Sequence, residues 1–246
     1  MTPISTAPPR SIASISTVSA AGVCASVAAF DAAARDLGYP SMALAREIAL
    51  YTGQREGDLI QFSEGQLQQL AILDPVVRRA FAQDDSPVWG WQLDQTKTST
   101  DYSRRMLSIP LEPQLLDRIQ TALRSNRARD RAATPPRLLS SVLVDDRPGP
   151  NNGLPWKKRE FIRAYTRILA HAAKATGRSH MTGLTWHDLR RTRVVRLRRK
   201  GYDKTMIGAI LGIDPKTIDA MLKIYGPIDP TITAAALAAD LQERSA

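Results

Sequence analysis

Cysteine and histidine are both scarce in this chain of 246 residues, which has one cysteine, Cys24, and three histidines. One cysteine excludes an intrachain disulfide framework and a zinc site built from several thiolates. Long apolar runs are also missing, since a membrane-spanning helix needs roughly 20 such residues. The composition, 43% hydrophobic and 24% charged, is that of a globular protein. We therefore expect a soluble, cytoplasmic protein with no membrane partner.

Acidic residues are too few to balance the basic ones: 24 stand against 34, which gives a net charge of +10 and a pI of about 10.1. The excess is concentrated in residues 157–200, where fourteen basic residues face two acids, a formal charge of +12. A solvated pair of helices would explain this density, and so would a surface that binds a nucleic-acid backbone. The candidate backbone contacts are Lys157, Lys158, Arg191 and Arg193.

Three parts are expected along the chain. Residues 1–24 are rich in Ser, Thr, Ala and Pro and lack apolar periodicity, so we expect a flexible tail. Residues 25–229 carry the periodic segments of a folded domain. Residues 230–246 contain a final Ala-rich helix after Pro230.

Apolar spacing predicts mostly helices within this domain. They are expected at 26–37, 41–53, 55–62, 113–123, 156–176, from N-cap candidate Thr185 onward, at 205–212 and at 215–225. Two β-branched and aromatic runs, Val88–Leu93 and Arg105–Leu111, predict a hairpin with a long tip. Loops are expected at 125–137 and 145–155. The fold class is therefore mixed, mainly α with a small antiparallel β-sheet.

Two segments bring together arginines and their partners. Arg55, in TGQREGDL, lies where one helix stops and the next begins, and Asp58 follows one turn later, where it can hold the guanidinium. In WHDLRRT, His187 and Arg190 are three residues apart, on one face of a helix near its N-terminus.

Lys97 on the hairpin tip and Tyr225 in KIYGP complete a set suited to phosphodiester chemistry. Two guanidiniums can bind phosphate oxygens bidentately. A phenol can act as nucleophile, and an ammonium can protonate the leaving sugar oxygen. Because these groups supply the charge, and no acidic cluster with metal-binding spacing accompanies them, we expect neither a metal nor a cofactor.

In order and spacing, these segments resemble the tyrosine recombinase (phage integrase) family over roughly residues 41–229. TGQREGDL resembles the first arginine box, QTKTS to IPL the lysine hairpin, HDLRRT the His-x-x-Arg box, and ILG to IYG the tyrosine segment. The resemblance implies a site-specific recombinase or integrase of a mobile element, acting on double-stranded DNA. It further implies these roles: phosphate binding by Arg55 and Arg190, general acid catalysis by Lys97, proton transfer by His187, support by Asp58 and a 3'-phosphotyrosine at Tyr225.

The chain departs from the family pattern in two places. Ile213 follows Leu211 and Gly212, where the family usually has histidine or tryptophan; Lys216, nine residues before Tyr225, could supply a hydrogen-bond donor instead. Only some 40 residues precede the match, so the family's separate core-binding domain is not apparent. A catalytically impaired DNA-binding derivative and a type IB topoisomerase-like enzyme therefore remain alternatives.

Structural roles also remain open for the site residues. Arg55 could form a surface ion pair, His187 could cap its helix, Lys97 could be an ordinary hairpin charge, and Tyr225 could be a packed aromatic. In the resembling family the C-terminal segment often packs in trans, which implies a homo-oligomer on DNA and contact between subunits through residues 230–246; packing in cis is the alternative. Accessory DNA-bending proteins are possible further partners.

Overall fold

The structure is a computed structural model that describes residues 20–225, except 73, 83–85, 96–104 and 138. Lys97 and residues 230–246 therefore lie outside the described residues, as does most of the expected N-terminal tail. The α-helices are α1 (Ala20–Asp36), α2 (Pro40–Thr52), α3 (Glu56–Ile60), α4 (Pro75–Phe81), α5 (Pro113–Ala132), α6 (Lys158–Thr176), α7 (Trp186–Arg199), α8 (Lys204–Leu211) and α9 (Pro215–Tyr225). Short 3-10 helices lie at Glu64–Gln66 and Ser179–Gly183, and the strands are β1 (Leu67–Leu70), β2 (Val88–Gln95) and β3 (Arg105–Pro110).

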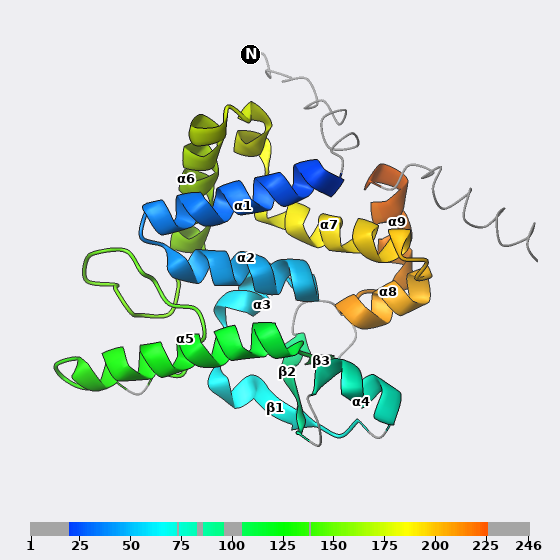
Figure 1. The fold of residues 1–246 in the computed structure, drawn as a ribbon, viewed down its shortest axis with the longest axis horizontal. Helices are drawn as coiled ribbons and strands as arrows, with labels where there is room; N and C mark the ends of the chain where they lie inside the picture. Colours follow the sequence, from blue (N-terminus) through cyan, green and yellow to red (C-terminus); the bar gives the residue numbers. More distant parts are fainter. Residues whose placement is uncertain (1–19, 73, 83–85, 96–104, 138, 226–246) are drawn as a thin grey trace, which may run out of the picture.

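Helices surround the middle of the molecule, and the sheet lies to one side with α4 (Figure 1). α1 packs against α2 and α6, while α2 also packs against α5 and α7. α8 and α9 pack against each other and against α7, beyond the other helices (Figure 1). The expected fold class is confirmed. None of the described helices is long and apolar enough to cross a membrane.

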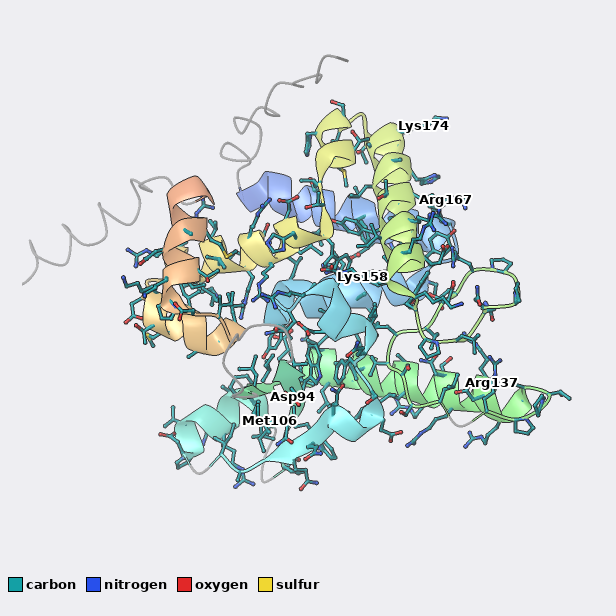
Figure 2. All side chains as sticks on the ribbon, turned by 180° about the vertical axis from the view of Figure 1, so that it is seen from behind. Asp94, Met106, Arg137, Lys158, Arg167 and Lys174 are labelled. Carbon is teal, nitrogen blue, oxygen red and sulfur yellow. The ribbon has the colours of Figure 1, made fainter. Side chains whose placement is uncertain are left out.

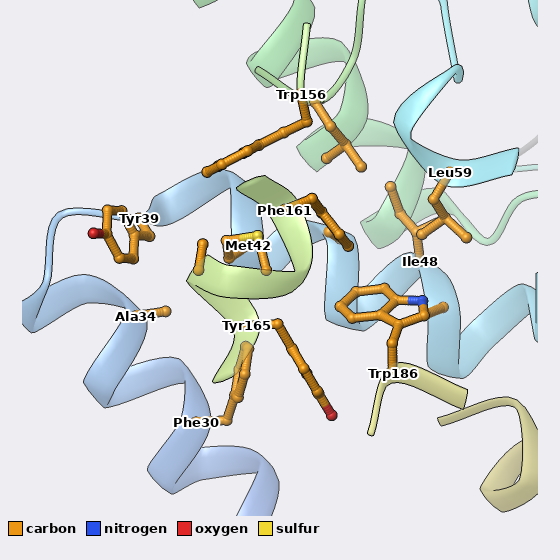
Figure 3. Close-up of a cluster of buried hydrophobic side chains, with 14 of the residues drawn as sticks. Phe30, Ala34, Tyr39, Met42, Ile48, Leu59, Trp156, Phe161, Tyr165 and Trp186 are labelled. Carbon is orange, nitrogen blue, oxygen red and sulfur yellow. The ribbon is translucent and has the colours of Figure 1, made fainter. Parts of the chain in front are cut away.

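Aromatic side chains dominate the core between α1, α2, α6 and α7 (Figure 3). Tyr165 lies between Phe30 and Trp186, with ring centroids 5.4 and 5.0 Å away, and Phe161 meets Trp186 edge to face at 4.7 Å. Edge-to-face pairs are favoured by the ring quadrupoles. Trp186 is the first residue of α7, so this core fixes the start of the helix that carries His187 and Arg190.

The sheet has the order β1-β2-β3, and both pairs are antiparallel. The predicted hairpin is confirmed, with Trp91 opposite Ile109. Trp91 is fully buried and stacks on Phe62, with centroids 4.4 Å apart. β1 and α4 were not predicted from the sequence; the four residues of β1, LQQL, carry too little alternation to be recognised as a strand.

Two predicted boundaries are wrong. α5 continues to Ala132, through most of the segment predicted as a loop from residue 125. Asn126 and Asp130 explain this extension, because both are buried on α5 and Asn126 donates hydrogen bonds to the carbonyls of Ser141 and Val142. α1 begins at Ala20 rather than at residue 26, consistent with the high helix propensity of its alanines.

A second, smaller core joins the C-terminal half of α7 to α8 and α9. Its buried members are Val194, Leu197, Ile207, Leu211, Ile213 and Ile218. Asp203 caps the start of α8, since its carboxylate accepts a hydrogen bond from the Met206 N–H at 2.8 Å, and Gly212 caps its end with φ 64°. α9, which ends at Tyr225, is thereby packed onto the helix that carries Arg190.

Candidate active site

The turn between α2 and α3 presents Arg55. Gly53 ends α2 with φ 69°, a left-handed conformation that glycine adopts readily, and its N–H donates to the Ala49 carbonyl at 2.8 Å. Arg55 is then the N-cap of α3, and its carbonyl accepts hydrogen bonds from the N–H groups of Asp58 and Leu59. Its side chain therefore leaves the backbone at the junction of two helices and is half-buried.

Arg190 lies at the same turn, on α7. Its side chain is buried, and its Nη1 donates to the Gly53 carbonyl at 2.7 Å. Burial and the nearby charge of Arg55 together lower the pKa of Arg190 to about 10, while the charges of Asp58 and Glu56 act in the opposite direction. Arg190 therefore keeps its charge at neutral pH, and it is brought together with Arg55 as the sequence analysis expected.

Asp58 is half-buried and lies close enough to both arginines for their charges to act on its carboxyl group. Burial raises the pKa of its carboxyl above the ordinary value, while a hydrogen bond from the Arg55 backbone and the charges of Arg55 and Arg190 act in the opposite direction. The carboxylate thus faces both guanidiniums and partly neutralises them. Two cations and one anion leave a net positive site suited to one phosphate group.

His187 projects from the first turn of α7 into solvent. A capping box fixes this turn, because the Thr185 N–H donates to the Asp188 carboxylate at 2.7 Å. Partial desolvation lowers the pKa of His187, and the charges of Arg191 and Arg190 lower it further. The imidazole is therefore neutral at neutral pH and can accept a proton.

Glu56 is a member of the site that the sequence analysis did not single out. Its carboxylate pairs with Lys158 Nζ at 2.7 Å, which links α3 to α6, and its charge also acts on Arg190 and His187. Figure 2 shows Lys158 at the end of α6 nearest α3. In the sequence, only the position of Glu56 directly after Arg55 indicated that Glu56 belongs to the site.

The four expected backbone contacts differ in their surroundings. Lys157 and Lys158 are exposed at the start of α6. Arg191 is half-buried and pairs with Asp188 at 2.8 Å. Arg193 is also half-buried, with its guanidinium 5.7 Å from the centre of the Tyr51 ring. The two lysines are therefore the more accessible of the four to an incoming polyanion.

Two further predicted site residues, Tyr225 and Lys216, belong to α9. Tyr225 is the last residue of α9, and its side chain is outside the described part of the structure. Ile213 is buried in the smaller core, with 4% exposure, so it offers no donor at the surface. Lys216 is exposed in the first turn of α9, where its N–H donates to the Asp214 carboxylate at 2.7 Å.

The hairpin approaches α8 and the start of α9. A cleft of about 420 Å³ is lined by Met106 and Leu107 of β3 and, on the other side, by Gly208, Ile213 and Pro215 among others. The start of β3 therefore lies across this cleft from α8 and the first residue of α9. In the described ranges, no group of three or more His, Cys, Asp or Glu residues lies together so that it could hold a metal ion.

Several solved structures share this fold at low sequence identity. The Tn1549 transposon integrase in complex with a circular intermediate DNA matches with a TM-score of 0.60 and 16% identity, over 93% of this chain and 65% of that one. The XerA recombinase matches with a TM-score of 0.55 and 13% identity, over 87% and 62% of the two chains. The XerH site-specific recombinase bound to palindromic difH substrate matches with a TM-score of 0.53 and 12% identity, over 89% and 52%.

This chain spans between about half and two thirds of the length of those solved chains. Neither a protein-family model nor a curated protein matches its sequence. The three structural matches cover 87% to 93% of this chain. The chain therefore has the fold of the tyrosine recombinase catalytic domain.

Proposed function

We propose that this protein is a site-specific DNA recombinase that cleaves and rejoins strands through a 3'-phosphotyrosine on Tyr225. The observation that carries the proposal is the buried Arg190, held by the Gly53 carbonyl beside Arg55 and Asp58. A buried guanidinium is held in a fixed orientation by its partners, and two guanidiniums at one site match the oxygens of a phosphodiester. The shared fold of solved recombinases bound to DNA supports the same reading.

In the proposed reaction, Arg55 and Arg190 bind the non-bridging oxygens of the scissile phosphate. The Tyr225 oxygen attacks phosphorus, the bond from phosphorus to the 5' oxygen breaks, and Lys97 protonates the departing oxygen. The neutral His187 accepts or relays the phenol proton. Rejoining is the reverse: a 5' hydroxyl attacks the phosphotyrosine and releases Tyr225, so no external energy source is consumed.

A nicked suicide duplex tests this proposal, because the short strand beyond the scissile bond diffuses away and traps the covalent intermediate. The wild-type chain should give a covalent protein–DNA band on its cognate site, and Tyr225→Phe should give none. The band should persist with EDTA, since guanidiniums supply the positive charge. Failure of the wild-type chain to form the band on cognate DNA would refute the enzymatic proposal.

The second candidate function is DNA binding without catalysis. Ile213 favours it, because its buried aliphatic side chain stands where the resembling family usually has a hydrogen-bonding residue. In that case the chain binds duplex DNA, and neither the wild type nor Lys216→Ala gives a covalent band. If the band forms and Lys216→Ala abolishes it, Lys216 supplies the missing donor. Relaxation of supercoiled plasmid lacking a cognate site would instead indicate type IB topoisomerase-like activity.

The proposal extends to assembly on double-stranded DNA. We place the subunit contact in residues 230–246, as a segment that docks on a neighbouring protomer. Deleting this segment should weaken multimer formation on DNA while single-site binding is retained, which gel-shift titration measures. A truncated chain that multimerises as well as the full chain would refute docking in trans.

A further inference from the structure

Gln54 is a polar side chain with only 1% exposure, between Gly53 and Arg55. A buried amide is costly unless its donors and acceptors are paired, so its partners indicate what the residue does. The amide Nε2 donates to the Thr52 carbonyl at 3.4 Å and to the Leu211 carbonyl at 3.3 Å. The first bond stays within the turn, whereas the second reaches a residue 157 positions away in sequence.

Leu211 is the last residue of α8, where backbone carbonyls have no partner within the helix. The turn and this helix end are also in close contact. A Cβ added to Gly53 would lie 2.2 Å from Leu211 Cδ2, which leaves no space between them for any side chain. The turn that presents Arg55 is therefore fixed against the end of α8 by one polar and one apolar contact.

α8 and α9 form one compact unit, so this contact reaches the helix that carries Tyr225. The Ile213 N–H donates to the Gly208 carbonyl at 2.9 Å, and a Cβ on Gly208 would lie 2.7 Å from the Ile213 carbonyl oxygen. Leu211, Ile213 and Ile218 share the smaller buried core. A displacement of the end of α8 must therefore be accompanied by a displacement of α9.

We propose that Gln54 is a positioning residue that couples the arginine pair to the helix of the nucleophile. Its amide holds the end of α8 against the turn in which the Gly53 carbonyl binds Arg190 and the next residue is Arg55. This role rests on the proposed strand cleavage by Tyr225. It requires no contact between Gln54 and DNA, since the side chain is buried.

Gln54→Met tests the role, because methionine keeps the length and burial of the side chain and removes the donor. At saturating suicide duplex, the single-turnover cleavage rate should fall by about 10- to 100-fold, since small errors in the placement of a nucleophile are costly. The dissociation constant for DNA should stay within about twofold, because phosphate contacts dominate affinity. A substrate with sulfur in place of the bridging 5' oxygen has a leaving group that needs no proton, so it restores the rate only where proton donation is the defect. It should therefore not restore the rate of Gln54→Met, in which the placement of the nucleophile is the defect.

Asn126→Leu is the matched control. Asn126 is also a buried amide that donates to two backbone carbonyls, but it lies on α5 and its two partners, Ser141 and Val142, are not residues of the candidate site. This variant should unfold at a lower temperature and still cleave within about twofold of the wild-type rate. Because both variants lose comparable hydrogen bonds, a rate loss in Gln54→Met alone separates positioning from general destabilisation.

The proposal is overturned if Gln54→Met cleaves at the wild-type rate, or if the sulfur-bridged substrate restores its rate. It is equally overturned if the lost rate is accounted for by weaker DNA binding. Should Gln54→Met fail to fold, Gln54→Asn replaces it; the shorter arm cannot reach Leu211, so a wild-type rate in that variant overturns the role. If the wild-type protein forms no covalent band, the proposed function itself fails. If the wild type forms the band and the Gln54 variant forms it at the same rate, only the role of Gln54 fails.

Discussion

At the scale of single residues, Arg190 combines two properties that usually oppose each other, burial and charge. Its Nη1 is held by the Gly53 carbonyl at 2.7 Å, and burial lowers its pKa to about 10. A desolvated guanidinium interacts more strongly with an incoming anion than a hydrated one, because less water must be displaced from it. The site is therefore organised before an anionic ligand binds.

Arg190→Lys keeps the charge and removes the planar fork, so it tests whether geometry matters. The cleavage rate should fall by about 100-fold, as is typical when one fixed donor to a transition-state oxygen is lost. Single-turnover cleavage of the suicide duplex measures this. Arg118→Lys is the control, because Arg118 is exposed and pairs with Glu47 on the α2–α5 surface; its rate should not change. Equal rates for Arg190→Lys and wild type would exclude Arg190 from phosphate binding.

His187 gives a prediction about pH. Desolvation and the neighbouring Arg191 and Arg190 lower its pKa from 6.5, so the folded protein binds this proton more weakly than the unfolded chain does. Stability linked to His187 is therefore complete above the unfolded pKa and is lost as pH falls through about 6.5 and below. An NMR titration, assigned with His187→Gln, should give a midpoint below 6.5. Duplex DNA should raise that midpoint, because a phosphate anion stabilises imidazolium; a DNA-independent midpoint would contradict the role at the phosphate.

At the scale of elements, the C-caps of α2 and α6 offer a matched pair. Gly53 and Gly177 end their helices with φ 69° and 67°, and a Cβ at Gly177 would meet nothing within 4 Å. Gly177→Ala should cost about 1 kcal/mol, the strain of a left-handed alanine. Gly53→Ala adds overlap with Leu211 and Arg193, so urea unfolding should give a loss of about 2 to 4 kcal/mol.

Activity separates these two variants further. Gly53→Ala should also reduce cleavage by the folded protein, because its carbonyl binds Arg190 and its Cα lies against the end of α8. Gly177→Ala should leave cleavage unchanged. If the two variants lose equal stability and equal activity, the packing of the α2–α3 turn against α8 is not important to the site.

Sequence patterns were informative where the determinants are local. The stop at Gly53, the cap at Thr185 and the hairpin strands follow from neighbouring residues, and the structure has each of them. The end of α5 does not, because Asn126 is held by carbonyls of a distant segment. The same division applies to the site. The spacing of His187 and Arg190 is local and is visible in the sequence.

The long-range contacts of the site could not be predicted in this way. The bond from Gln54 to Leu211 joins segments 157 residues apart, and nothing in TGQREGDL indicates which way its glutamine points. Glu56 gave an equally weak signal, because its partner Lys158 lies on another helix. The sequence segments indicated the two arginines and the family resemblance implied their roles, while only the folded chain shows what holds them in place.

At the scale of the whole molecule, the acids of residues 157–200 are already engaged. Glu160 pairs with Arg147 and Arg163, and Asp188 pairs with Arg191. The positive excess of the segment is therefore not neutralised within it. Figure 2 shows Lys158, Arg167 and Lys174 spread along α6 from its first turn to its last.

This distribution predicts that DNA affinity depends strongly on salt. Each phosphate contact releases counterions, so the slope of log K against log salt should be about −0.9 per contact on duplex DNA. Lys157→Ala should make the slope shallower by about 0.9 if Lys157 contacts a phosphate. Lys158 is left unchanged because it pairs with Glu56. Arg118→Ala removes a cation that is paired with Glu47 on the α2–α5 surface, and should leave the slope unchanged. Fluorescence anisotropy titrations at several salt concentrations measure these slopes, and a wild-type slope near zero would exclude a surface that binds the DNA backbone.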